Sequence, residues 1–303
     1  MGRKAIEITM KKIDIHAHTT MWENTQIRQG VVFASPEQIH EIYGELGIDK
    51  GFLLPLISPE YRSSVQTNEE MEYLANKYSD TFYWFCNIDP RMGENSPKTD
   101  FSQFIEYYKK RGAVGVGELM ANLYIDDPLL DNLFYHCGEC DMPVTIHISE
   151  KIGNSYGIVD DLGLPRLEKM LKKYPKLKIA GHSQCFWSEI GDNVNEENRC
   201  GYPTGKVKNG RITELMREYP NLYCDLSAGS GYTAMSRDPE FTYRFIEEFS
   251  DRLMFGTDIV RPNQKPLLSS WLDEAYENGC ITEENYYKVC RGNAIKLYKL
   301  NIK

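Results

Sequence analysis

The sequence lacks any apolar run of the length needed to cross a bilayer, which is about 20 residues. It also lacks a basic stretch that would follow a phosphate backbone, and its 303 residues carry a formal net charge of −9. These absences argue against a membrane segment and against a nucleic-acid partner, and they favour a small-molecule ligand. The N-terminal residues have no apolar signal core, so we expect a cytoplasmic location.

Closely spaced cysteines are also scarce. Of the eight cysteines, only Cys137 and Cys140 form a tight pair, and no second Cys or His pair stands nearby at the spacing of a zinc finger. In a chain without an export signal we interpret all eight as reduced thiols. The sequence therefore predicts no disulfide.

Short apolar segments typical of strands recur along the chain and alternate with segments of helical periodicity. The predicted strands are residues 12–17, 51–56, 82–88, 113–119, 143–148, 177–182, 222–226 and 253–257. The predicted helices are residues 36–46, 68–78, 101–111, 129–140, 165–174, 212–219 and 241–249, with a further helical tract from about residue 267. Strands this apolar are parallel and buried on both faces. The pattern predicts one α/β domain over residues 1–303, a (β/α)8 barrel with a C-terminal helical extension, and an open doubly wound sheet is the alternative.

Two predicted connections, residues 19–35 and 183–210, are too long to be plain linkers. Long loops in compact domains usually carry function. The second loop mixes polar and aromatic residues, which suits a lid or a subunit contact.

Polar residues end several of the apolar strands, at the barrel face where active sites lie. His16 and His18 are one residue apart, so in an extended chain their side chains project to the same side. Four of the six histidines lie at strand ends. The strand-end residues are His16, His18, Glu118, His147, His182 and Asp258. Imidazole and carboxylate groups suit Zn²⁺ or another first-row metal such as Mn²⁺, which in a catalytic site lowers the pKa of water to about 7.

These residues, taken together, resemble the amidohydrolase superfamily, specifically its amidohydrolase-2 branch, which also contains enzymes related to aminocarboxymuconate-semialdehyde decarboxylase. The resemblance covers nearly the whole chain. It rests on His16-x-His18, His147, Gly181-His182, Gly256-Thr257-Asp258 and Arg291-Gly292-Asn293-Ala294-x-x-Leu297-Tyr298.

The resemblance implies that one divalent metal ion is bound by His16, His18, His147 and Asp258. It also implies catalytic roles for two residues: Asp258 moves a proton from water to the leaving group, and His182 orients a carbonyl or acts as acid or base. Glu118 bridges two ions in some relatives, so it is either a further ligand or a hydrogen-bonding group at the barrel mouth. We expect one ion rather than two. Because family members are often dimers, the resemblance also implies a possible homodimer.

Three residues are candidates for substrate binding. Arg261 and Arg91 follow strand ends and are able to reach a substrate carboxylate, although a structural ion pair explains either arginine as well. Trp187 lies in the second long connection and is a candidate for the pocket wall, with core packing as the alternative.

Three functions compete on these observations. The first is a metal-dependent hydrolase of an amide or lactone bond, which Glu118 favours. The second is a non-oxidative decarboxylase of an aromatic or unsaturated acid that uses the same ligands, which Arg261 and Arg91 favour. The third is a barrel that has kept its fold as a binding protein after losing activity, and the intact ligand set argues against it.

Overall fold

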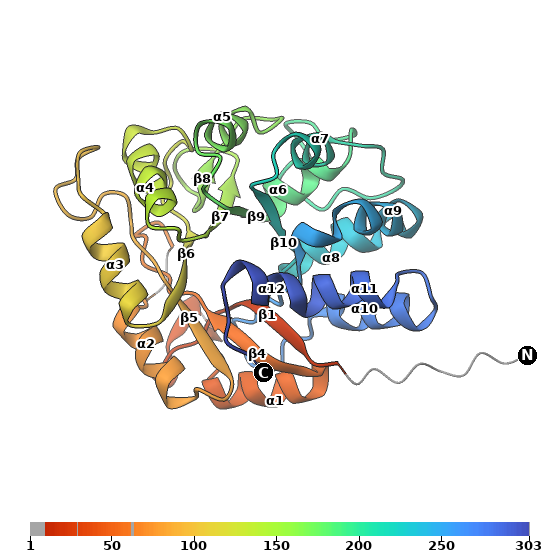
Figure 1. The fold of residues 1–303 in the computed structure, drawn as a ribbon, viewed down its shortest axis with the longest axis horizontal. Helices are drawn as coiled ribbons and strands as arrows, with labels where there is room; N and C mark the ends of the chain where they lie inside the picture. Colours follow the sequence, from red (N-terminus) through yellow and green to blue (C-terminus); the bar gives the residue numbers. More distant parts are fainter. Residues whose placement is uncertain (1–9, 29, 62–63, 303) are drawn as a thin grey trace, which may run out of the picture.

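Eight parallel strands form the centre of the protein (Figure 1). We analysed a computed structural model that describes residues 10–28, 30–61 and 64–302. The strands follow one another around the sheet in chain order, as β1 (Lys12–Ala17), β4 (Ile48–Leu53), β5 (Phe82–Cys86), β6 (Ala113–Leu119), β7 (Val144–Ser149), β9 (Ile179–His182), β10 (Leu222–Asp225) and β11 (Leu253–Met254). All eight predicted strands are confirmed, with shifted bounds at β4 and a shorter β11.

The sheet closes on itself just beyond its last strand. Ala17 and Ile259 form a parallel bridge, and the His18 backbone N–H donates to the Ile259 carbonyl at 2.8 Å. The Asp258 backbone N–H donates to the His16 carbonyl at 2.8 Å. These bonds join the segment after β11 to β1, so the prediction of a barrel is confirmed and the open sheet is excluded.

Helices surround the barrel (Figure 1). They are α1 (Pro36–Leu46), α2 (Asn68–Lys77), α3 (Ser102–Lys110), α4 (Pro128–Glu139), α5 (Pro165–Lys173), α6 (Gln184–Trp187), α7 (Arg211–Glu218), α8 (Ala228–Ser236), α9 (Pro239–Phe249), α10 (Leu267–Glu277), α11 (Glu283–Tyr287) and α12 (Asn293–Leu297), with short turns η1 (Ser188–Ile190), η2 (Ser250–Arg252) and η3 (Lys288–Gly292). Helix α8 was not predicted, because its Ala-Gly-Ser-Gly start has a low helix propensity.

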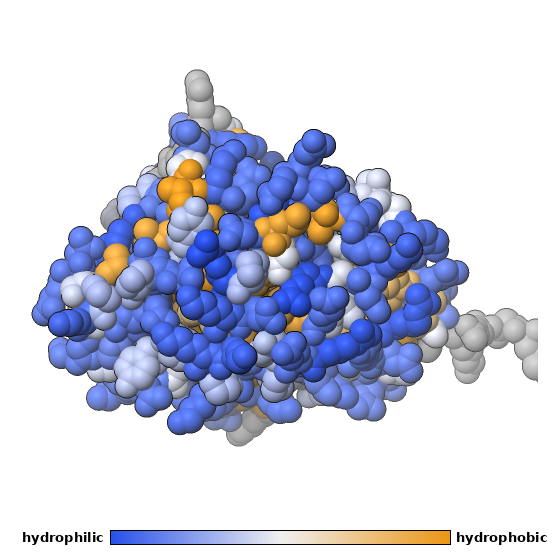
Figure 2. All heavy atoms as spheres, turned by 90° about the horizontal axis from the view of Figure 1, so that it is seen from above, coloured by the Kyte–Doolittle hydropathy of each residue, from blue (hydrophilic) through white to orange (hydrophobic). Residues whose placement is uncertain are grey.

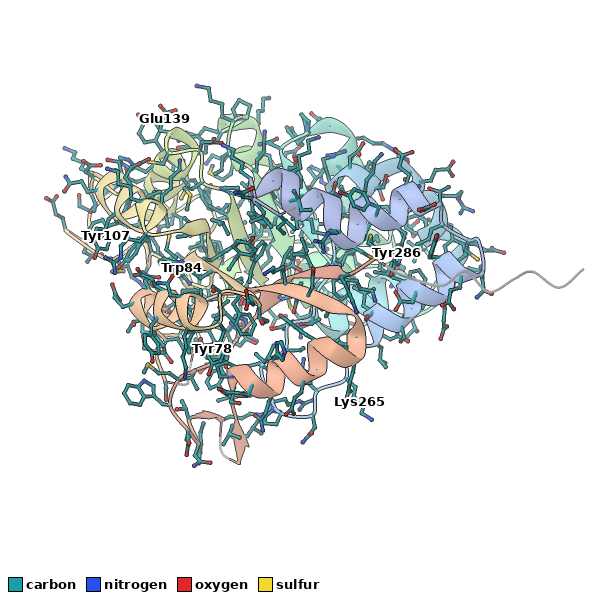
Figure 3. The ribbon with its side chains drawn as sticks, turned by 60° about the horizontal axis from the view of Figure 1, so that its bottom comes forward. Tyr78, Trp84, Tyr107, Glu139, Lys265 and Tyr286 are labelled. Atoms are coloured by element: carbon teal, nitrogen blue, oxygen red, sulfur yellow. A yellow bond between two sulfur atoms is a disulfide. The ribbon has the colours of Figure 1, made fainter. Side chains whose placement is uncertain are left out.

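Local signals fix where helices begin. Ser35 accepts a hydrogen bond from the Gln38 backbone N–H at 3.3 Å, and the Gln38 side chain accepts from the Ser35 N–H at 2.9 Å, so α1 starts with a capping box. Farther along, Tyr286 lies in α11 (Figure 3). It stacks on Tyr276 of α10 and donates to Asp273 at 2.5 Å. These contacts join the helices that follow the last strand.

Apolar residues fill the barrel. Strand residues such as Ile13, Phe52 and Phe85 pack with Tyr298, whose ring centroid lies 4.9 Å from that of Phe52 and 5.1 Å from that of Phe85. Helix α12 therefore lies across the ring of strands and closes one end of it (Figure 1). In (β/α)8 barrels functional residues lie at the other end, where the strands terminate.

Both long connections contain structure of their own. Residues 19–35 include the antiparallel pair β2 (Gln26–Arg28) and β3 (Val31–Val32), and residues 183–210 include α6 and η1. A further short strand, β8 (Ile158–Val159), pairs with β7. The face of the molecule shown in Figure 2 is mainly hydrophilic, with small separate apolar groups. None of the helices in the described ranges is long and apolar enough to span a membrane.

Candidate metal centre

The six strand-end residues converge at the carboxyl end of the barrel. His16 lies in β1, Glu118 in β6, His147 in β7 and His182 in β9, while Asp258 follows β11. Strands β7 and β9 pair with His147 directly opposite His182. The side chains of His16 and His18 also project to the same side, as predicted, since their Nε2 atoms lie 3.0 Å apart.

The hydrogen bonds of His16 and His18 leave two nitrogen lone pairs facing each other. His16 Nδ1 lies 2.6 Å from Asp225 Oδ2, and His18 Nδ1 lies 2.8 Å from the Leu54 carbonyl oxygen. Because both oxygens only accept hydrogen bonds, each Nδ1 must carry the proton, and in the neutral rings both Nε2 atoms are acceptors. Two acceptors 3.0 Å apart repel each other unless a cation or an additional proton lies between them.

Two carboxylates complete the cluster around these nitrogens. Glu118 Oε2 lies 3.5 Å from each Nε2 atom, and Asp258 Oδ1 lies 3.8 Å from His16 Nε2 and 3.5 Å from His18 Nε2. Donor atoms held at about 2.0–2.1 Å from one zinc ion lie roughly 3 to 3.5 Å apart. The spacing of the His16, His18 and Asp258 donor atoms therefore fits one divalent ion, and Glu118 forms a second, overlapping group with His16 and His182.

The negative charges of the cluster also favour the binding of a cation. Burial lowers the pKa of His16, but the adjacent carboxylates of Asp225 and Glu118 outweigh it and raise that pKa well above its ordinary value. Burial raises the pKa of Glu118, yet His16 and His147 hold it well below its ordinary value. Glu118 and Asp225 thus stay ionised inside the protein, and a divalent ion neutralises them better than one proton does.

His182 differs from His16 and His18 in the ring nitrogen that carries the proton. Ser227 Oγ lies 3.0 Å from His182 Nδ1 and 3.2 Å from His16 Nδ1. Since His16 Nδ1 gives its proton to Asp225, the Ser227 hydroxyl is free to donate its own proton to His182 Nδ1. The remaining proton of neutral His182 is then on Nε2, which lies 3.6 Å from Glu118 Oε1. Burial also lowers the pKa of His182, which favours this neutral form.

His147 contacts the cluster through Glu118. Its Nδ1 atom lies 2.7 Å from Glu118 Oε1, and its ring centroid is 5.4 Å from that of His182. In the structure Glu118, rather than His147, has its donor atom within 3.5 Å of both Nε2 atoms. The role of His147 as a ligand stays a prediction, and Glu118 becomes the stronger candidate.

Sequence reasoning missed Asp225 and Ser227. Asp225 is fully buried, ends β10, and binds His16 across 209 residues of sequence. A carboxylate that fixes the far nitrogen of a ligating histidine sets its tautomer and raises its basicity. The signal was available, because Asp225 is the polar residue at the end of the seventh predicted strand.

We expect Asp225→Asn to lower metal affinity by about 10-fold to 100-fold, as removal of such supporting carboxylates does. The asparagine keeps the size of the side chain but presents a weaker acceptor to His16 Nδ1. Calorimetric titration with Zn²⁺ measures the change. Asp192→Asn, an exposed position away from the cluster, is the matched control and should bind Zn²⁺ like the parent.

A cavity of about 640 Å³ opens over the cluster. Its wall includes His18, Glu118, His147 and Asp258, together with aromatic residues and two arginines from the surrounding loops. Asp258 is the candidate ligand most open to this space, with 29% of its side chain exposed against 0% for His16 and 4% for Glu118. A molecule in the cavity therefore meets Asp258 first.

Two of the three predicted substrate-binding residues do not line this cavity. Arg91 binds Glu60 and Asp89, so two carboxylates already neutralise its guanidinium, and a substrate-binding role for it stays a prediction. Trp187 is 2% exposed and donates from Nε1 to the Asp225 carbonyl at 2.8 Å, so it packs behind the site. Arg261 does line the cavity.

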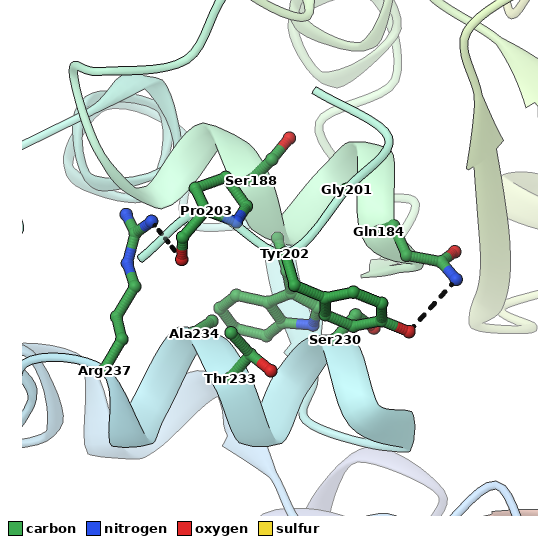
Figure 4. Close-up of a pocket in the computed structure, with 10 residues that line it drawn as sticks. Gln184, Ser188, Gly201, Tyr202, Pro203, Ser230, Thr233, Ala234 and Arg237 are labelled. Atoms are coloured by element: carbon green, nitrogen blue, oxygen red, sulfur yellow. Dashed lines mark hydrogen bonds between the residues drawn. The ribbon is translucent and has the colours of Figure 1, made fainter. Parts of the chain in front are cut away.

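The prediction of eight free thiols is wrong for two cysteines. Cys185 and Cys200 form a disulfide between α6 and the loop that follows η1. The same loop carries Tyr202, whose hydroxyl accepts from the Gln184 amide at 3.3 Å beside a second, water-sized cavity of about 10 Å³ (Figure 4). The fold of this loop brings the two cysteines together, which their spacing in the sequence does not indicate.

The fold and the site define a (β/α)8 barrel with a histidine and carboxylate cluster at the carboxyl ends of its strands. A family model described as Amidohydrolase matches residues 13–300. The chain therefore belongs to the amidohydrolase family. The comparison with curated proteins finds no match.

Several solved structures share the fold. 2,6-Dihydroxybenzoate decarboxylase from Rhizobium has a TM-score of 0.61 at 15% identity, with 97% of this chain and 100% of that chain covered. A dihydroxybenzoic acid decarboxylase from Polaromonas sp. JS666, with bound manganese and 2-nitroresorcinol, has a TM-score of 0.59 at 18% identity and covers 97% and 98%. A probable 2-pyrone-4,6-dicarboxylic acid hydrolase from Acinetobacter baumannii, with citric acid bound, has a TM-score of 0.55 at 14% identity and covers 96% and 100%.

Proposed function

We propose that this protein is a metal-dependent hydrolase of an amide or lactone bond in a small organic molecule. The observation that carries the proposal is the position of Glu118, whose carboxylate lies 3.5 Å from the Nε2 atoms of both His16 and His18. This placement supports Glu118 as a metal ligand, which is the reading that favours hydrolysis. Zn²⁺ suits the donor set, and Mn²⁺ is the alternative, as in the Polaromonas structure with bound manganese.

The protein's own residues supply the proton chemistry. When bound, a divalent ion lowers the pKa of water and polarises a carbonyl oxygen. Asp258, in the cavity wall, accepts the proton of the attacking water and returns it to the leaving nitrogen or oxygen. His182 donates its Nε2 proton to the carbonyl oxygen and so stabilises the negative charge that develops there.

Non-oxidative decarboxylation of an aromatic or unsaturated acid is the second candidate. Two structures with the same fold are named as decarboxylases of dihydroxybenzoic acids, and one is named as a probable hydrolase of a pyrone dicarboxylic acid. The same residues serve a decarboxylase, in which Asp258 or His182 protonates the ring carbon that loses CO₂. Arg261 in the cavity wall supplies a contact for an acidic substrate.

A turnover panel separates the two functions. Protein loaded with Zn²⁺ or Mn²⁺ is incubated with lactones, N-acyl compounds and hydroxybenzoate-type acids, and release of acid and of CO₂ is recorded. Acid release from a lactone or N-acyl compound supports the hydrolase. Release of CO₂ without hydrolysis of any panel member contradicts it and supports the decarboxylase.

The cytoplasmic location and the homodimer stay predictions from the sequence.

A further inference from the structure

One buried amide side chain holds the loop between β7 and β8. Asn122 follows β6 and is 7% exposed. Its Nδ2 atom donates to the Lys151 carbonyl at 3.0 Å and to the Gly157 carbonyl at 3.1 Å, and its Oδ1 atom accepts from the Gly153 backbone N–H at 2.6 Å. These bonds use both protons of the amide and one of its lone pairs. A single side chain therefore fixes residues 151–157 at three points.

Solvent covers the outer side of this loop. Residues 151–154 are exposed, and Gly153 has a φ of +79°, a left-handed conformation that favours glycine. The hydroxyls of Ser149 and Ser155 lie 2.7 Å apart and join the two ends of the loop. Because exposed residues gain little from packing, the bonds to Asn122 have a large share in keeping the loop in place.

The inner side of the loop faces the metal cluster. Asn154, Ser155 and Tyr156 line the cavity of about 640 Å³, and the Tyr156 ring centroid lies 4.8 Å from that of His147. Gly157 has a φ of +105°, and a Cβ at this position would lie 2.7 Å from His147 Cδ2. The backbone of the loop thus touches the imidazole ring. A shift of the loop moves the cavity wall and the surroundings of His147 together.

We propose that Asn122 is a positioning residue of the candidate metal centre, because its amide keeps Tyr156 and Gly157 against His147 and so sets the shape of one cavity wall. Asn122 does not itself line the cavity, so its effect on a bound molecule passes through the loop. The inference rests on the proposed function where it concerns turnover, since the wall belongs to the same site. Loss of Asn122 weakens substrate binding and leaves the proton chemistry nearly unchanged.

Asn122→Asp tests the inference in the full-length protein. The aspartate keeps the shape of the side chain and the acceptor for Gly153, but it loses both donations and places a negative charge beside the carbonyls of Lys151 and Gly157. Proteolysis of a loop follows the population of its opened form. Trypsin should therefore cut after Lys151 at least about tenfold faster than in the parent, and mass spectrometry identifies the cut.

Asn221→Asp is the matched control. Asn221 is 2% exposed, and its Nδ2 atom donates to the carbonyls of Leu171, Tyr174 and Leu177 between α5 and β9, outside the cavity. Thermal unfolding measures the general cost of losing such an asparagine in both variants. The control should leave cleavage of the loop at the parental rate. If Asn122→Asp does not fold, Asn122→Ser, which is uncharged and has one donor, replaces it.

The NMR resonance of His147 gives a readout at the site that needs no substrate. Protein labelled at its six histidines is compared at identical metal loading, and His147→Gln assigns the resonance. Because the Tyr156 ring packs against this imidazole, we expect the resonance to move in Asn122→Asp and to keep its position in Asn221→Asp. Faster cleavage with an unmoved His147 resonance overturns the inference, since the loop then has no influence on the site.

Turnover gives a second readout. On the best panel substrate, the KM of Asn122→Asp should rise about tenfold while kcat stays within about twofold of the parent, which is the pattern of lost binding rather than lost chemistry. A KM equal to that of Asn221→Asp overturns the inference, and so does a fall in kcat alone.

Failure of this inference is distinct from failure of the proposed function. A protein that hydrolyses panel members, with KM and the His147 resonance unchanged in Asn122→Asp, keeps its function and loses the positioning role. A protein that turns over no panel member loses the hydrolase, and the His147 resonance then decides the inference alone.

Discussion

Replacing Asp258 by asparagine is expected to lower kcat by at least about a thousandfold, within the range that general acid–base catalysis supplies. Asp258 Oδ1 lies within 3.8 Å of the Nε2 atoms of both His16 and His18 and is open to the cavity. Asparagine keeps an oxygen at this position but accepts no proton from water at neutral pH. Steady-state turnover on the best panel substrate, at saturating Zn²⁺ or Mn²⁺, measures the loss.

The saturating metal separates the two roles of Asp258. If the variant binds metal with reduced affinity and regains parental kcat once the site is filled, Asp258 is a ligand and not the proton carrier, and the mechanism is wrong at this step. Asp192→Asn serves again as the control with an unchanged rate.

The second large effect concerns Glu118. Glu118→Gln should lower metal affinity by at least about a hundredfold, which exceeds the usual effect of a supporting residue. The side chain lies close to His16, His18, His147 and His182, and its charge is the one that these imidazoles surround. Glutamine keeps the shape and removes the charge. Competition with a chromophoric chelator measures the affinity.

Glu70→Gln is the matched control for a buried glutamate. Glu70 accepts from Thr20 Oγ1 at 2.7 Å and from the Met21 backbone N–H at 2.8 Å, away from the imidazoles. Its replacement should change thermal stability and leave metal affinity near that of the parent. If Glu118→Gln binds metal as tightly as Glu70→Gln does, Glu118 is only a hydrogen-bonding group at the barrel mouth.

The barrel and most of its site were predictable because both follow from periodic patterns. Apolar strands that alternate with helices specify parallel pairing, and parallel strands bring their carboxyl ends to one face. Residues as distant as His16 and Asp258 therefore meet without any local signal that joins them. The same rule predicts a site residue at the end of the seventh strand, and that residue is Asp225.

Other features depended on pairings that a single sequence does not contain. The sequence suggests Arg91 as a substrate-binding residue, but in the fold the carboxylates of Glu60 and Asp89 neutralise its guanidinium. The Cys185–Cys200 disulfide depends on how the loop after β9 folds back. The β2–β3 hairpin has only two short strands, which are too short to show a strand pattern in the sequence.

Metal stoichiometry tests the central claim most directly. Protein purified without chelator, and then titrated with Zn²⁺, should bind about one ion per chain, and His18→Ala should lose this binding while its thermal unfolding remains cooperative. If the parent binds no divalent ion at micromolar concentrations, or if His18→Ala binds it as tightly as the parent, then His16, His18, Glu118 and Asp258 do not surround a metal ion and the account is contradicted.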